Sequence, residues 1–240
     1  MNWTTVFFVI LPYMAVAVCV GMTAYRAVYR PSTLSSLTSQ LLEHKKLYWG
    51  STAFHWGVML TLAGHVLAIV APRALQLWDG SPIRLYLLEA TGMALGLWAL
   101  AGLLILLWRR ASEARIRAVT SPMDVAIMLL LLVSLATGVS VALLYPYGSL
   151  WFTGVATPYL WSLATLRPRP ELLTDMAVLV KIHVFNFFLL LAAFPFSRLV
   201  HVITLPLSYL YRPWQLVIWN RRPVPPDGSG NPAAPGRSRR

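Results

Sequence analysis

Residues 51–71 read STAFHWGVMLTLAGHVLAIVA, an apolar run that contains two histidines, His55 and His65. As a helix with a rise of 1.5 Å per residue, this run would be about 31 Å long, which matches the hydrocarbon thickness of a bilayer. Ionisable side chains in such segments are rare and usually functional, because burying them in lipid is expensive. The run therefore predicts a membrane-spanning helix that carries a functional site.

The composition of the whole chain also indicates a membrane protein. Of the 240 residues, 58% are hydrophobic and 12% are charged, whereas ordinary soluble domains have roughly 25% charged residues. The net charge of +12 does not indicate a nucleic-acid partner, because Lys and Arg cluster at the ends of apolar segments. Cys19 is the single cysteine, and the missing CxxCH motif excludes a covalently attached c-type haem.

Five segments are long and apolar enough to cross a bilayer, and each must be helical because lipid cannot satisfy an open backbone. They run approximately from Trp3 to Thr23, Ser51 to Ala71, Leu85 to Trp108, Met123 to Leu144 and Met176 to Thr204. We predict an all-α integral membrane protein whose five-helix domain covers residues 1–220. The Pro/Gly/Ser-rich residues 221–240 are expected to form a disordered cytoplasmic tail.

Positive charges are distributed unequally between the two sides of the predicted bundle. One side has twelve: Arg26, Arg30, Lys45, Lys46, Arg109, Arg110, Arg115, Arg117, Arg198, Arg212, Arg221 and Arg222. The other side has four: Arg73, Arg84, Arg167 and Arg169. Cytoplasmic loops carry the excess of Lys and Arg, so we expect the N-terminus outside and the C-terminus in the cytoplasm. The expected location is the cytoplasmic membrane of a bacterium or archaeon, with the lipid bilayer as a partner.

Local motifs add three expectations. In SPMD, Ser121 and Asp124 predict a capped helix N-terminus at the fourth span. Gly92 and Gly96, in GMALG, have the spacing of a close helix contact. The loop after the fourth span suits a segment in the membrane interface on the outer side, because it carries several large aromatic residues: Trp151, Phe152, Tyr159 and Trp161.

Four histidines lie on two antiparallel spans, and their positions predict two pairs. His55 and His201 would lie near the cytoplasm, and His65 and His183 near the outer side. Along straight helices the separations differ, at about 15 Å for ten residues and about 27 Å for eighteen. The eighteen-residue step puts His183 and His201 on one face of the fifth helix, and a kink at Pro195 would absorb part of the mismatch.

Neutral imidazole is the commonest protein ligand for metals, and each pair could clamp one haem iron from both sides. Carboxylates and thiols are missing beside the pairs, which disfavours zinc. Iron with two axial histidines has no open position, so such haems carry single electrons. A proton-relay transporter or a plain membrane anchor is the alternative, but a relay predicts acidic partners at mid-membrane depth, whereas Glu89 and Asp124 lie at span ends.

The residues SQLLEHKKLYWGSTAFHWGVMLTLAGH and KIHVFNFFLLLAAFPFSRLVHVITLPLSYLYRPWQLV, with RIRAVTSPMD after the third span, resemble the gamma (cytochrome b) subunit of membrane-bound respiratory nitrate reductase. The resemblance covers roughly residues 1–220. A related di-haem cytochrome b subunit of another respiratory complex, such as one associated with sulfite reduction, shares the histidine plan and is the alternative within this class.

The resemblance implies two b-type haems, a distal one held by His65 and His183 and a proximal one held by His55 and His201. It implies that menaquinol or ubiquinol is oxidised beside the distal haem, where Gly64 matches a glycine that lets the quinol ring approach. Electrons would pass to an iron–sulfur beta subunit and then to a molybdenum alpha subunit that reduces nitrate in the cytoplasm. This chain would not reduce nitrate itself.

The sequence departs from the family at the quinol site. Where the family has a lysine near the start of the third span, this chain has Tyr86, with Arg84 two residues earlier. Either side chain could bond a quinone carbonyl or a haem propionate, or simply mark the membrane interface. Arg198 and Lys181 are candidates to neutralise propionates, and otherwise they are a positive flank and a snorkelling lysine.

Overall fold

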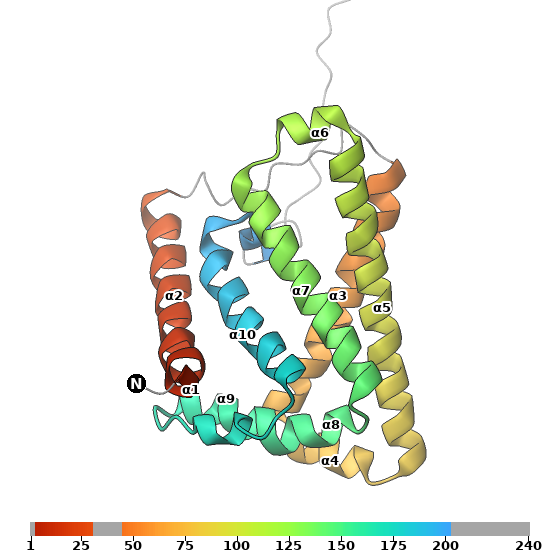
Figure 1. The fold of residues 1–240 in the computed structure, drawn as a ribbon, viewed down its shortest axis with the longest axis vertical. Helices are drawn as coiled ribbons and strands as arrows, with labels where there is room; N and C mark the ends of the chain where they lie inside the picture. Colours follow the sequence, from red (N-terminus) through yellow and green to blue (C-terminus); the bar gives the residue numbers. More distant parts are fainter. Residues whose placement is uncertain (1–2, 31–44, 203–240) are drawn as a thin grey trace, which may run out of the picture. The chain divides into compact units, whose positions relative to one another are not determined.

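Five helices long and apolar enough to cross a membrane form most of the structure, as the hydropathy of the sequence predicts (Figure 1). The structure is a computed structural model, and it describes residues 3–30 and 45–202. The five spans are Trp3–Tyr29, Leu47–Val70, Pro82–Ser112, Pro122–Leu144 and Val178–Phe196. The predicted tail at 221–240 lies outside the described residues.

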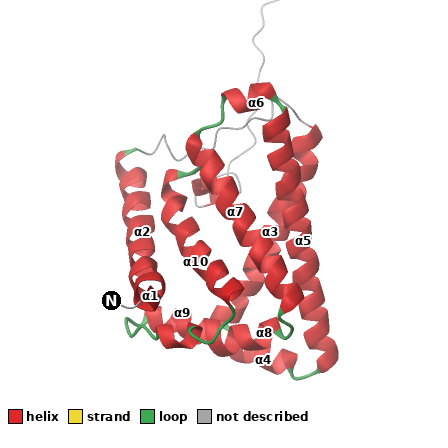
Figure 2. Ribbon diagram, in the orientation of Figure 1, coloured by secondary structure: helices red, strands yellow, loops and turns green. Residues whose placement is uncertain are grey.

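The regular elements of the described ranges are all helical (Figure 2). The first span comprises α1 (Trp3–Thr5), the π-helical η1 (Val6–Ile10) and α2 (Leu11–Tyr29). The next elements are α3 (Lys45–Val70), α4 (Pro72–Asp79), α5 (Pro82–Ser112), α6 (Ala114–Ala118) and α7 (Pro122–Leu144). The remainder are α8 (Gly148–Trp151), η3 (Phe152–Ala156), α9 (Thr157–Ala164), η4 (Pro170–Leu173), α10 (Val178–Ala193), η5 (Phe194–Phe196) and η6 (Arg198–Val202).

Short helices cover the two ends of the bundle differently. The helices α4, α8 and α9 lie across one end, which we call the α9 end, and α6 lies at the opposite end, which we call the α6 end (Figure 1). The helices α3 and α7 run from the α6 end to the α9 end, whereas α2, α5 and α10 run the other way. The two histidine-bearing segments are therefore antiparallel, as the pairing of the histidines requires.

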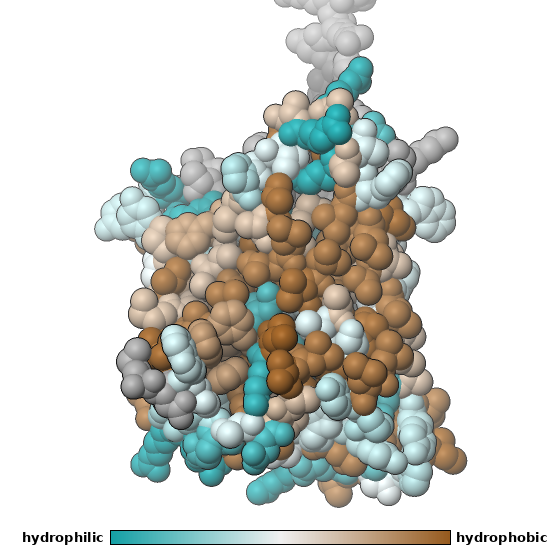
Figure 3. Space-filling model, viewed as in Figure 1, coloured by the Kyte–Doolittle hydropathy of each residue, from teal (hydrophilic) through white to brown (hydrophobic). Residues whose placement is uncertain are grey.

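The surface between the two ends is apolar. In Figure 3 a hydrophobic band occupies the middle of the molecule, and hydrophilic residues gather above and below it. Large aliphatic side chains on the spans are about half exposed, for example Leu62 (53%), Leu67 (53%) and Leu129 (54%). In water such a surface would be costly, so the band fits the hydrocarbon of a bilayer.

Small residues bring α3 and α5 together until their backbones touch. A Cβ atom added at Gly57 would lie 2.8 Å from the backbone N of Ala99, and one at Gly102 would lie 2.4 Å from the backbone N of Phe54. Close approach through small residues is the usual means of association for helices in lipid, where the hydrophobic effect does not drive helices together. The predicted contact at Gly96 is confirmed by Val139, at 3.2 Å from an added Cβ, but the prediction for Gly92 is wrong because nothing lies within 4 Å of it.

Two prolines create carbonyl acceptors that fix the α9 segment in place. Because proline lacks an N–H, Pro12 leaves the carbonyl of Phe8 without its helical donor. The hydroxyl of Tyr159 donates to this carbonyl at 2.9 Å. In the same way, Pro72 frees the carbonyl of Ala68, which accepts from the hydroxyl of Thr157 at 3.1 Å.

The aromatic loop lies at one end of the bundle as predicted, but its side chains have different surroundings. Trp161 is exposed and donates from Nε1 to the carbonyl of Ile69 at 3.0 Å, which suits an interfacial residue. Tyr159 is fully buried at 0% exposure, so the prediction of an interfacial position was wrong for this residue. Its hydroxyl is used to satisfy the carbonyl of Phe8, and its ring packs in the core with Leu163 and Phe188.

The fifth span is broken at Pro195, where the sequence predicts a kink, so the predicted helix from Met176 is not continuous; its predicted end at Thr204 lies outside the described residues. The α-helix ends at Ala193, a single 3₁₀ turn follows at Phe194–Phe196, and Ser197 is extended before η6 begins. Pro195 accounts for the break because it cannot donate to the preceding turn. Arg26 on α2 donates to the carbonyl of Pro195, and Ser197 caps the next turn by accepting from the N–H of Leu199 at 3.1 Å.

The close α3–α5 contact predicts that a glycine-to-alanine substitution lowers stability within the contact but not at a glycine with open space around it. Gly102→Ala should destabilise the protein by about 1–3 kcal/mol, because the new Cβ meets backbone that cannot rotate away. Gly21→Ala on α2, where nothing lies within 4 Å, should be neutral or slightly stabilising. Thermal unfolding in detergent, followed by circular dichroism, measures both, and equal melting temperatures would contradict the packing described.

Candidate functional site

The break in the fifth span places two histidines against each other near the α6 end. His55 lies on α3, and His201 lies on η6 beyond the break. Their ring centroids are 6.0 Å apart, with an angle of 65° between the ring planes. A metal–imidazole bond is about 2 Å long, so one ion between two imidazole nitrogens would place the ring centroids roughly 6 Å apart. The observed spacing fits a metal held between His55 and His201.

A second pair lies closer to the α9 end. His65, ten residues further along α3, lies within electrostatic reach of His183 on α10. The ring of Phe152 packs edge-on against His65 at 5.2 Å between centroids. On the other side, Gly138 makes room for the ring of His183, because an added Cβ would lie 3.1 Å from its Cε1 atom. The surroundings of this pair therefore come from three spans, α3, α7 and α10, and from the short helix η3.

In three of these histidines, a hydrogen bond from Nδ1 to a backbone carbonyl sets the tautomer. The Nδ1 atoms of His55, His65 and His201 lie 2.8, 2.8 and 2.7 Å from the backbone carbonyls of Ser51, Thr61 and Arg198, respectively. A carbonyl only accepts, so each Nδ1 carries the hydrogen and each neutral ring keeps a lone pair on Nε2. An Nδ1–H bonded to a carbonyl is the usual support for a histidine that binds a metal through Nε2.

The fourth histidine reaches the same state through a side chain. Nδ1 of His183 lies 2.9 Å from the hydroxyl of Thr137 on α7. That hydroxyl donates its single hydrogen to the carbonyl of Val133 at 2.6 Å, so toward His183 it acts as an acceptor. One helical turn further along, Asn186 donates to the carbonyl of Leu130 at 2.9 Å and holds α10 against α7. All four rings are therefore oriented with Nε2 available as a ligand.

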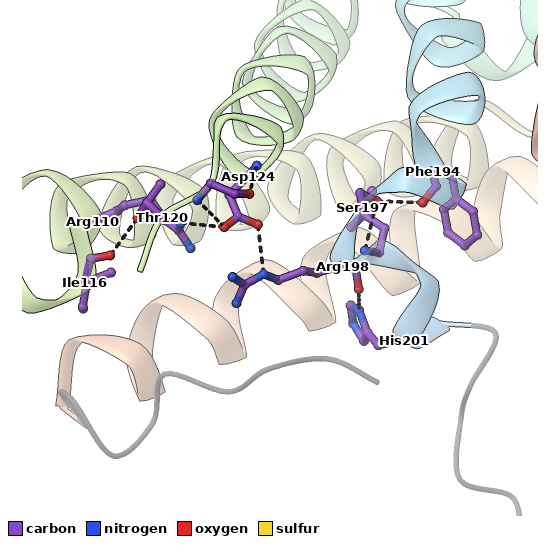
Figure 4. A network of polar contacts seen from close by, with 10 residues as sticks. Arg110, Ile116, Thr120, Asp124, Phe194, Ser197, Arg198 and His201 are labelled. Carbon is purple, nitrogen blue, oxygen red and sulfur yellow. Dashed lines mark hydrogen bonds and ion pairs between the residues drawn. The ribbon is translucent and has the colours of Figure 1, made fainter. Parts of the chain in front are cut away.

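An ion-pair network fixes the segment that carries His201 (Figure 4). Arg198 places its Nε atom 3.0 Å from Oδ1 of Asp124, and Arg110 places an amino group 3.4 Å from Oδ2. Asp124 also completes the capping box with Ser121 at the start of α7, which confirms the predicted N-cap. Because the carbonyl of Arg198 accepts from His201, the position of Asp124 is transmitted to this histidine.

The other predicted site residues lie near the histidines or at the α9 end, and two have structural partners. Lys181 donates from Nζ to the carbonyl of Thr174 at 2.6 Å. Arg84 donates to the carbonyls of Leu77 and Trp78 and so caps α4. Tyr86 is 55% exposed, with its ring 6.5 Å from that of Tyr147, and a Cβ added at Gly64 would meet nothing within 4 Å.

Sequence reasoning missed the parts of the site that come from α7. Thr137 and Gly138 are adjacent and touch His183 from one side, yet neither belongs to a recognisable motif. Their role depends on the packing of α7 against α10, which hydropathy does not predict. Across the described residues, no three His, Cys, Asp or Glu side chains are grouped as ligands of one ion, so each pair offers two protein ligands.

A family model described as nitrate reductase gamma subunit matches residues 4–220 of the chain. The chain belongs to this family. The nitrate reductase gamma chain of Bacillus subtilis is 35% identical over 217 residues, which cover 89% of this chain and 96% of the relative. Respiratory nitrate reductase 1 gamma chain of Escherichia coli is 30% identical over 217 residues, covering 88% and 95%.

A longer relative contains the same region. The nitrate reductase-like protein NarX of Mycobacterium tuberculosis is 28% identical over 221 residues, which cover 87% of this chain but 33% of that protein. With five spans and this family membership, the gamma-family chain is a multi-pass membrane subunit of nitrate reductase, an oxidoreductase complex.

The network at Asp124 predicts a graded loss of stability. Ser121→Ala removes the cap of α7 and should cost about 1 kcal/mol. Asp124→Asn weakens the cap and also removes the charge that pairs with Arg198 and Arg110, so it should lower the melting temperature further. Thermal unfolding of both variants in detergent tests this order, and a smaller effect for Asp124→Asn would mean that the ion pairs contribute nothing.

Proposed function

We propose that the chain is a di-haem cytochrome b subunit that oxidises quinol near the outer face of the membrane. It passes the electrons to an iron–sulfur subunit and a molybdenum nitrate reductase subunit in the cytoplasm. The observation that carries the proposal is the presence of two histidine pairs, all four with Nδ1 bonded so that Nε2 can bind a metal. The names of the Bacillus subtilis and Escherichia coli relatives supply the nitrate reductase complex.

The donor set suits haem better than a bare ion. Each pair provides two imidazole nitrogens, and a porphyrin would supply the remaining four ligands of an octahedral iron. Haem with both axial positions filled by histidine supplies single-electron transfer and leaves no open position for a substrate. His55 and His201 would hold the inner haem, and His65 and His183 the outer one.

The distribution of charge supports a cytoplasmic α6 end. Arg109, Arg110, Arg115 and Arg117 all belong to the last turn of α5 or to α6. By the positive-inside rule this end faces the cytoplasm, with the N-terminus outside in a bacterial or archaeal cytoplasmic membrane. Arg109 is buried, so the accessible Arg110, Arg115 and Arg117 would form the basic surface that receives the electron-accepting subunits.

Arg198 and Lys181 remain the proposed partners of haem propionates, and each also has a role in holding the backbone. Arg198 combines a link to Asp124 with a bond to His201, so it fixes the inner ligand. Lys181 lies two residues from His183 at the α9 end. On the quinol side, Gly64 leaves open space beside His65, which supports the close approach of a menaquinol or ubiquinol ring.

The pairing predicts a specific pattern of haem loss. The purified wild-type chain should bind two b-type haems, measured as pyridine haemochrome per polypeptide. His55→Ala or His201→Ala should remove one, and His65→Ala or His183→Ala should remove the other, which a redox titration would identify by its potential. A folded, membrane-inserted chain without haem would overturn the proposal, as would variants that each retain both haems.

Gly138 gives a second prediction that leaves all four ligands intact. Gly138→Val should push the ring of His183 out of place and reduce the haem content toward one per chain, because an added Cβ already approaches the ring to 3.1 Å. Gly92→Val on α5 is the matched control, since nothing lies within 4 Å of that position. Haem content near two in both variants would show that Gly138 does not shape the site.

A further inference from the structure

Buried polar atoms without a partner are concentrated at the α9 end. Seven buried side-chain nitrogen and oxygen atoms in the described part of the chain have no hydrogen-bond partner, and five of them belong to Asp79, Glu89, Ser149 and Trp151. These four residues lie on α4, α5 and α8, which contact one another. Leaving a polar group buried and unpaired costs about 1–3 kcal/mol, so a cluster of this kind indicates a site that binds something polar.

Glu89 has one occupied and one free carboxylate oxygen. Its Oε2 accepts the backbone N–H of Tyr147 at 3.2 Å, and its Oε1 is buried without a partner. The Nε1–H of Trp151 is also buried and unpaired. A Cβ atom added at Gly148 would lie 3.9 Å from both of these atoms, so an acceptor and a donor face the same small space.

Contacts connect this space to the outer histidine pair. Trp151 stands beside Phe152, with ring centroids 6.4 Å apart, and Phe152 packs on His65 at 5.2 Å. The packing register of α3 against α5 also places Glu89 at about the same depth in the bundle as His65. Gly57 packs on Ala99, so in an antiparallel pair the residue opposite His65 lies within one helical turn of Glu89.

The space is bordered by groups that would admit an apolar molecule with a polar head. Tyr86 and Tyr147 are about half exposed at its edge, with their ring centroids 6.5 Å apart. The charged groups nearby are Asp79 on α4, which is 6% exposed, and Arg84, which is bound to the carbonyl groups at the end of α4. Tyr86 is also within electrostatic reach of Glu89.

We infer that Glu89, Trp151 and Ser149 bind the head group of the quinol, and that Glu89 accepts the proton of the hydroxyl bonded to it. This inference rests on the proposed function. One quinol oxygen can donate its hydrogen to Oε1 of Glu89 while accepting the Nε1–H of Trp151. The O–H bond at Oε1 breaks as its proton moves to Glu89, which then releases it to the outer side. The proton of the second hydroxyl, at the far end of the ring, leaves to water on the outer side, and the two electrons would pass singly to the two ferric haems of the proposed function, so that quinone is the product.

A purely structural role for Glu89 makes a different prediction. In that case the carboxylate would serve to hold the N–H of Tyr147, which has the left-handed φ of 63° and is the N-cap residue before α8. A glutamine keeps an oxygen for that hydrogen bond but cannot take a proton. Glu89→Gln therefore separates the two roles.

The test uses the full chain with its haems and menadiol, a soluble naphthoquinol, as the reductant. In Glu89→Gln the rate of haem reduction by menadiol should fall about 100-fold or more, the typical contribution of a general base. The dithionite-reduced spectrum and the melting temperature should stay unchanged. Infrared difference spectra on menadiol addition should contain the C=O band of a protonated carboxylic acid, and the variant should lack it.

A rate within about threefold of the wild type, or an infrared band that persists, would overturn the assignment of Glu89. Wild-type chain that binds no haem would instead refute the proposed function, so the two failures are distinguishable.

A second pair of variants tests the location without changing Glu89. Gly148→Leu fills the space between Oε1 and Nε1 and should raise the KM for menadiol at least about tenfold, a loss of about 1.4 kcal/mol in binding. Gly154→Leu on η3, where nothing lies within 4 Å, should leave the KM unchanged. Equal KM values in the two variants would place the quinol elsewhere, even if Glu89→Gln failed to fold.

Discussion

A backbone polar group in lipid has no water to bond, and this constraint explains several of the long-range hydrogen bonds that hold the bundle together. Pro12 and Pro72 each free the carbonyl four residues earlier, and the chain supplies a donor from a distant segment: Tyr159 reaches the carbonyl of Phe8, and Thr157 reaches that of Ala68. At the break in the fifth span, Arg26 donates to the carbonyl of Pro195 itself. Tertiary structure is therefore specified by hydrogen bonds at helix interruptions as well as by close packing.

The same chemistry prepares the histidines. Three of them give their Nδ1–H to a carbonyl of the preceding helical turn, and the fourth gives it to a threonine hydroxyl that is itself engaged. These bonds satisfy the Nδ1 donor and leave Nε2 with its lone pair. Each ring is thus held in one orientation with Nε2 free, which is the arrangement that a metal-binding histidine requires.

The break after α10 allows the histidines of the fifth span to pair with those of α3, although the two pairs of positions have different spacings along the chain. Ten residues separate the histidines of α3 and eighteen separate those of the fifth span, yet His55 and His201 lie 6.0 Å apart between ring centroids. The 3₁₀ turn at Pro195 redirects the chain, and the ion pair between Arg198 and Asp124 fixes the redirected segment to the start of α7. The position of His201 therefore depends on Asp124, a residue 77 positions earlier in the chain.

The sequence by itself determined the five spans and the cap of α7, and it marked the histidines as candidate ligands, because hydropathy, capping and the scarcity of ionisable residues in lipid are local properties. Only the tertiary structure decided what faces each histidine. Thr137 and Gly138 belong to the site through the packing of α7 on α10, and Glu89 meets Trp151 because α8 folds against α5. Such neighbours come from separate helices, whose mutual rotation depends on close packing and buried hydrogen bonds that no single segment encodes.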